Sequence, residues 1–126
     1  MSADDDGDFI VVSASTASRF VAVRIYDETV FEHIPTHHPE IKLAGSELGS
    51  QLIRPAIEEA LTSPTKIFDS ATSTESQVFV CENLTFQGNS LVVPVKAVDG
   101  TTDGRVQTAY FANDFSGTLV WSADNE

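Results

Sequence analysis

Short strand-like segments, separated by turn residues, fill the second half of the chain and constrain its fold more than any other feature. They are rich in β-branched and aromatic residues, which favour pleated strands. The segments are residues 66–68, 77–82, 91–98, 105–112 and 118–121. The stretch from Asp99 to Gly104, with two Asp/Gly pairs, is typical of a hairpin between two of them. Pro94 cannot donate to a ladder, so we expect an edge position or a bulge there.

The first half of the chain mixes strand-like and helical patterns. Residues 9–14 and 19–26 are strand-like, and the second of these alternates along its length. Asp27 is a suitable cap for a short helix over residues 27–34. Apolar residues then recur at helical spacing over residues 46–61, where Pro55 predicts a kink or restart.

The order of elements along the chain, helices first and a sheet afterwards, predicts an α+β fold. We expect N-terminal helices packed on a mostly antiparallel sheet of four to five strands. At 126 residues the chain is long enough for one core. Residues 1–8 are acidic and lack a large, core-forming apolar residue after Met1, which predicts a disordered tail before a single domain over residues 9–122.

Charge is the unusual element of the composition. Nineteen acidic residues against seven basic ones give a net charge of −12 at pH 7. Such a field repels nucleic acid at low salt. The charge is consistent with a halophilic protein kept soluble in concentrated salt, with a mimic of polyanionic nucleic acid, or with an acidic surface of no special role.

Location and redox chemistry follow from what the sequence lacks. The opening residues carry no basic segment before an apolar run, and no apolar stretch is long enough to cross a bilayer. A single cysteine, Cys81, excludes an internal disulfide and a multi-cysteine zinc site, and we expect it to be a small core residue. The sequence predicts a cytoplasmic protein without membrane contact.

The three histidines, His33, His37 and His38, lie within six residues of one another in a proline-rich segment. Histidine suits proton transfer near neutral pH. One of them could instead cap a helix C-terminus, where a partial positive charge is favoured, while the others face solvent. A metal site is not expected, because Pro35 interrupts the helix that would align His33 with His37.

Two features of the late strands also suggest chemistry. Lys96 lies in an apolar strand of a lysine-poor chain, where it either protects a sheet edge or holds a phosphate. Thr108 and Tyr110 are two residues apart, so both hydroxyls point to one face of a strand. A hairpin would bring this strand beside that of Lys96.

In order along the chain, these segments resemble a known family of small RNases. The segments are His33-Ile-Pro-Thr-His-His-Pro-Glu40, the helix exit Ala56-Ile-Glu-Glu-Ala-Leu-Thr-Ser-Pro64, Lys66-Ile-Phe68, the Lys96 strand and Gln107-Thr-Ala-Tyr-Phe111. The pattern is similar to the barnase–EndoU–colicin–RelE class, especially its branch in phages and other mobile elements. It covers roughly residues 30–112, and which histidine matches the family motif stays open. The −12 charge and the scarcity of arginine depart from the family.

The resemblance implies a metal-independent endoribonuclease of the toxin or RNA-processing type, without a cofactor. His33, His37 or His38 would supply the acid and the base, and Lys96 with Thr108 or Tyr110 would stabilise the phosphate charge. Arg105 and Lys66 would bind substrate. The expected partners are RNA and a possible cognate inhibitor protein. The alternative is a non-catalytic acidic protein that mimics nucleic acid or inhibits a basic enzyme.

Overall fold

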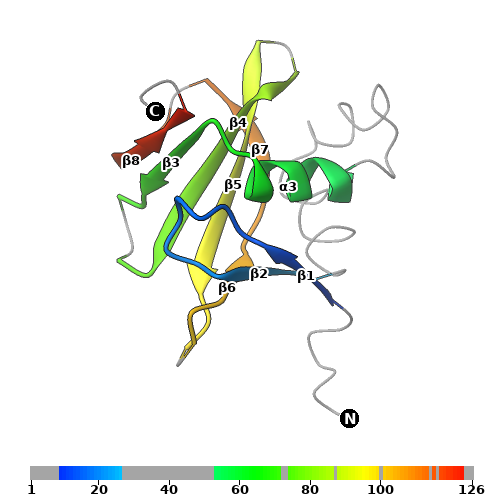
Figure 1. The fold of residues 1–126 in the computed structure, drawn as a ribbon. Coiled ribbons are helices and arrows are strands. Elements are labelled where there is room, and N and C mark those ends of the chain that lie inside the picture. The colour runs from blue at the N-terminus through cyan, green and yellow to red at the C-terminus, as the bar shows by residue number, and fades with distance from the viewer. Residues whose placement is uncertain are drawn as a thin grey trace.

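The computed structural model describes residues 9–26, 53–71, 74–86, 88–99, 101–113, 115 and 117–123. These residues form eight strands and one helix (Figure 1). The strands are β1 (Phe9–Ser13), β2 (Ala22–Tyr26), β3 (Lys66–Asp69), β4 (Ser76–Phe86), β5 (Asn89–Ala97), β6 (Gly104–Val106), β7 (Tyr110–Ala112) and β8 (Thr118–Ser122). The helix is α3 (Ile53–Thr62).

All eight strands belong to one mixed sheet. Seven of them run in the order β1-β2-β6-β5-β4-β3-β8, and β7 pairs with β5. The β2–β6 pairing is parallel and every other pairing is antiparallel. The parallel pair joins the N-terminal β1–β2 hairpin to the sheet built by the second half of the chain.

The predicted α+β fold, with N-terminal helices on a four- to five-stranded sheet, is wrong. Among the described residues the fold is mostly β, with one short helix and eight strands. The N-terminal hairpin extends the sheet instead of standing apart from it, and the predicted strand over residues 105–112 is divided into β6 and β7. The helix expected over residues 27–34 and the first residues of the one expected over 46–61 lie outside the described part of the chain.

Local sequence explains where α3 lies. Pro55 is the third residue of the helix, in the first turn, where backbone N–H groups have no partner within the helix. Pro55 therefore causes no break within α3. Ser63 donates its amide to the Glu59 carbonyl at 2.8 Å, and Pro64 follows immediately and ends the helix as the sequence predicts.

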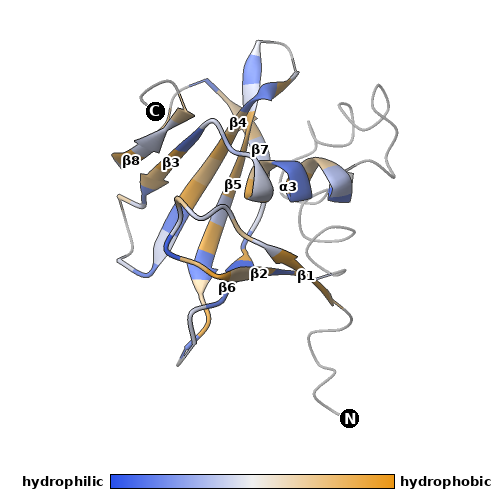
Figure 2. Ribbon diagram, viewed as in Figure 1, coloured by the Kyte–Doolittle hydropathy of each residue, from blue (hydrophilic) through white to orange (hydrophobic). Residues whose placement is uncertain are grey.

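The core lies between α3 and one face of the sheet, which we call the helix face. Ile57, Ala60 and Leu61 of α3 are fully buried against this face. The sheet contributes alternate residues of its strands, among them Val23, Ile25, Ile67, Phe79, Cys81, Val93 and Val95. Figure 2 shows hydrophobic residues concentrated along β4 and β5, the long central hairpin of the sheet.

The β5–β6 hairpin confirms the turn predicted between Asp99 and Gly104. Val98 donates its amide to the Asp103 carbonyl at 2.9 Å, and the two strands pair antiparallel on either side. Pro94 lies in the interior of the sheet and not at an edge. Its carbonyl accepts the Gln107 amide at 2.9 Å. Because Pro94 has no N–H to offer the same neighbour, the ladder stops there, and β6 and β7 are separate strands.

No helix among the described residues is long and apolar enough to cross a membrane.

Candidate functional site

Three basic residues occupy three adjacent strands at one level of the sheet. Arg24 of β2 pairs with Arg105 of β6, and Arg105 pairs with Lys96 of β5. The residues on either side of each along its strand pack into the core, so all three side chains leave the sheet on the face opposite α3. Adjacent strands are about 4.8 Å apart, so the three attachment points span about 10 Å. We call Arg24, Arg105 and Lys96 the basic row.

The basic row works against stability, because like charges placed directly across a sheet repel. It takes three of only seven basic residues in the chain. Arg24 reaches the carboxylate of Asp103 at 3.8 Å, with both side chains about one-third exposed. An ion pair of that exposure contributes about 0–1 kcal/mol. Lys96 is exposed, and no acceptor among the described residues lies within bonding distance of its ammonium. This row is a suitable place for an anion.

Aromatic rings hold the arginines of the row in position. The Arg105 guanidinium lies 4.3 Å from the centre of the Tyr26 ring, and the Arg24 guanidinium lies 5.5 Å from that of Phe9. The two rings contact each other with their centres 4.7 Å apart. Tyr26 is buried, at 6% exposure. Cation–π contacts of this kind contribute about 0.5–2 kcal/mol, and the value is larger when the pair is shielded from water. Both arginines are therefore oriented before any ligand arrives.

Thr108 and Tyr110 lie at the break between β6 and β7. Tyr110 pairs with Val92 of β5, which places it on the same face as Lys96 but four residues away along the strand, about 13 Å. Burial raises the pKa of the Tyr110 phenol above its ordinary 10.0. The phenol is protonated at neutral pH in either case and can donate a hydrogen bond. The Thr108 hydroxyl is buried and has no hydrogen-bond partner within the described part of the chain.

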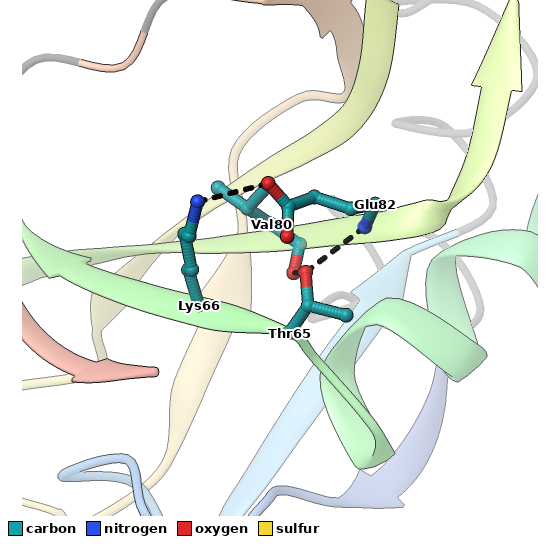
Figure 3. A network of polar contacts seen from close by, with 4 residues as sticks. All are labelled: Thr65, Lys66, Val80 and Glu82. Atoms are coloured by element: carbon teal, nitrogen blue, oxygen red, sulfur yellow. Dashed lines mark hydrogen bonds and ion pairs between the residues drawn. The ribbon is translucent and has the colours of Figure 1, made fainter. Parts of the chain in front are cut away.

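Lys66 is already engaged in an ion pair. Its ammonium lies 2.9 Å from the Glu82 carboxylate (Figure 3). Thr65 braces the pair from the neighbouring position, since its hydroxyl donates to the Val80 carbonyl at 3.2 Å and accepts the Glu82 amide at 3.0 Å. Lys66 pairs with Val80 of β4 at the level of Tyr110, so it is not part of the basic row.

Of the predicted site residues, the structure brings Arg105 and Lys96 together as direct neighbours. His33, His37 and His38 lie outside the described residues, and their predicted role stays a prediction. Sequence reasoning missed Arg24, together with the two aromatic rings that support the row. The signal for Arg24 was present in the alternation of residues 19–26, which puts it opposite Val23 and Ile25. No signal in the sequence indicated that Arg24 pairs with β6.

Two further features limit the chemistry available to the sheet. Cys81 is fully buried, and burial raises the pKa of its thiol, so the thiolate is disfavoured. Within the described ranges, no group of three or more His, Cys, Asp or Glu side chains could hold a metal ion.

Comparison of the chain with protein-family models, with curated proteins and with solved structures finds no match.

Proposed function

We propose that the protein is a metal-independent endoribonuclease that holds the RNA backbone on the basic row. The observation that carries this proposal is the direct cross-strand register of Arg24, Arg105 and Lys96. Adjacent phosphates of RNA are a ligand that can use three closely spaced cations at once, and arginine binds phosphate through paired donors. The repulsion within the row in the free protein becomes attraction for the substrate.

The acidic composition is compatible with this site because the charge is unevenly distributed. The described residues contain six basic and seven acidic residues, a net charge of −1, out of −12 for the whole chain. The basic residues are Arg19, Arg24, Arg54, Lys66, Lys96 and Arg105. The described residues are thus close to neutral overall, and salt screens the charge of any acid that lies more than a Debye length from the row.

The proposed reaction is attack of a ribose 2′-OH on the adjacent phosphorus. The 2′-oxygen loses its proton to a base as the P–O2′ bond forms, and the P–O5′ bond breaks as an acid protonates the leaving 5′-oxygen. The products are a 2′,3′-cyclic phosphate and a 5′-OH. Lys96 and Arg105 stabilise the negative charge that grows on the non-bridging oxygens. His37, which lies between Pro35 and Pro39 in the sequence, is the first choice for proton transfer, with His33 or His38 as its counterpart.

The hydroxyls at the β6–β7 break have a separate role in this scheme. Tyr110, whose phenol is protonated at neutral pH, donates a hydrogen bond to a phosphate oxygen or to the ribose. The Thr108 hydroxyl is buried, so it can gain a partner only if the chain around it moves when substrate binds. Because Tyr110 lies along β5 from Lys96, the substrate would extend along this strand as well as across the row.

Cleavage of RNA by matched arginine variants tests the proposal. Arg105→Met removes one charge from the row, whereas Arg19→Met removes the same charge from a residue that bonds the Thr74 carbonyl at 2.6 Å, outside the row. Assays contain high salt and excess chelator. Removing a donor from the charge-stabilising group should lower the cleavage rate by about 10²-fold. Arg19→Met should cleave like the wild type.

His37→Ala completes the experiment, because loss of a general acid or base lowers the rate by about 10²–10⁴-fold. Cleavage that chelator abolishes, or that persists in both Arg105→Met and His37→Ala, contradicts the proposal. A wild-type chain that cleaves no RNA and binds a basic protein tightly would instead support the alternative of an acidic binding protein.

A further inference from the structure

The edge strand next to the basic row exposes apolar side chains on the same face as the row. Phe9 and Val11 of β1 are 44% and 59% exposed. Val11 pairs with Arg24, so its side chain lies beside the basic row on the next strand. Phe9 pairs with Tyr26, whose ring it contacts. Apolar groups and cations thus lie side by side at the end of the sheet.

The Phe9 ring is held in place although it is exposed. The Tyr26 ring contacts it at 4.7 Å between centres, at an interplanar angle of 37°, and the Arg24 guanidinium lies 5.5 Å from its centre. Holding an aromatic ring in water beside cations costs solvation and side-chain freedom. Proteins that bind single-stranded nucleic acid use this combination, in which cations follow the backbone and aromatic rings stack on unpaired bases.

The other edge of the sheet provides an internal comparison. Leu119 and Val120 of β8 are also 44% exposed, so apolar exposure alone does not distinguish the two edges. Beside β8, however, the nearest basic residue of the sheet is Lys66 of β3, and its charge is taken up by Glu82. Only at β1, among the described strands, does an exposed aromatic ring adjoin the basic row.

We propose that Phe9, supported by Val11, is a subsite for an unpaired base, and that the substrate is therefore single-stranded RNA. The strand crosses the sheet from β5 toward β1, with phosphates on the basic row and one base stacked on the Phe9 ring. This rests on the function proposed for the row. A duplex, whose bases are already stacked and paired, gains nothing from Phe9.

Binding measurements on the full chain with three probes test the subsite. The probes are a fluorescent uridine 12-mer, an RNA duplex of equal length and inorganic polyphosphate, all at one fixed KCl concentration. Phe9→Ser should weaken binding of the uridine 12-mer about tenfold, because stacking on an aromatic side chain contributes about that factor per base. Binding of polyphosphate, which has no bases, should not change. Leu119→Ser, at an equally exposed position on the other edge, should leave all three affinities unchanged.

Two further variants keep the test decisive. Phe9→Leu retains apolar bulk on β1 and guards against loss of the fold, and it should still weaken binding of the uridine 12-mer several-fold. Arg105→Met should weaken binding of all three probes. If Arg105→Met binds like the wild type, the function proposed for the row is wrong. If Arg105→Met weakens binding but both Phe9 variants bind the uridine 12-mer normally, or lose polyphosphate equally, only the base subsite is wrong.

Discussion

On the face of the sheet that α3 covers, Phe79, Val93 and Val95 have no exposed surface, and the core has no charged side chain among its members. On the opposite face, the residue that follows Val95 along the same strand is Lys96, beside Arg105. That face also buries Val80 and Val92, and its other charged pair, Lys66 with Glu82, lies at their level and away from the basic row. One backbone therefore supports both a dry core and a row of repelling cations. Stability comes from the first and is reduced by the second, as is common at functional sites.

Truncation on the helix face should give the largest effect. Phe79→Ala removes the largest fully buried side chain of the core, which also contacts Phe20 with ring centres 6.5 Å apart. The lost burial and the cavity should lower the free energy of unfolding by about 3–5 kcal/mol. Urea denaturation measures it. Val21→Ala, at a position 66% exposed, is the control and should change the same quantity by less than about 0.5 kcal/mol.

Overfilling the same core next to the basic row should have the second largest effect. A Cβ added at Gly104 would lie 2.5 Å from a Val95 methyl carbon and 3.0 Å from the Phe20 ring. Gly104→Ala should therefore lower the free energy of unfolding by about 1–3 kcal/mol. Because Gly104 precedes Arg105, the strain should also disturb the register of the row. A Gly104→Ala protein with wild-type stability and normal RNA binding would show that Val95 and Phe20 leave room for a methyl group at Gly104.

The two faces differ in how far the sequence predicts them. Local composition predicts where the strands lie, and it predicts the end of α3 at Pro64. It does not predict that residues 107–109 separate β6 from β7. The strand of residues 105–112 was predicted beside that of Lys96 because a hairpin is a local structure, but the register that pairs Lys96 with Arg105 was not predicted. The pairing of Arg24 with Arg105 joins residues far apart in the sequence, and no local pattern specifies it. This one parallel pairing both enlarges the sheet and completes the basic row.

Removing a charge from the row should separate stability from binding. Lys96→Met relieves repulsion with Arg105 and should raise the free energy of unfolding by up to about 1 kcal/mol, while it weakens RNA binding. Lys66→Met makes the same chemical change in a lysine paired with Glu82, and it should leave stability unchanged or lower it. Thermal and urea denaturation compare the two. A loss of stability in Lys96→Met would show that the ammonium already has a bonding partner in the free protein.

Each face contains a weakly acidic group whose pKa is raised by burial, Cys81 on one and Tyr110 on the other, so high pH should weaken both faces slightly. Burial raises the pKa of Cys81 above its ordinary 9.0 and that of Tyr110 above its ordinary 10.0. The unfolded chain ionises first at each group, so their contribution to stability is complete below those pKa values and is lost as pH rises through the folded ones. Denaturation curves between pH 8 and 11 should show this decline, and it should be reduced in Cys81→Ala and in Tyr110→Phe. If stability declines as steeply with pH in Cys81→Ala as in the wild type, the thiol ionises equally in the folded and unfolded states.

Deletion of residues 1–8 should have the smallest effect on stability. The segment has four aspartates and no large, core-forming apolar residue after Met1, and β1 begins only at Phe9. The free energy of unfolding should stay within about 0.5 kcal/mol of the wild type's. Four negative charges just before Phe9 in the sequence should still repel a polyanion at low salt, so the shortened chain should bind polyphosphate more tightly under that condition. In 1 M KCl, where screening acts over about 3 Å, the two chains should bind alike. A large loss of stability would show that the segment packs against the sheet, and that both faces depend on residues before Phe9.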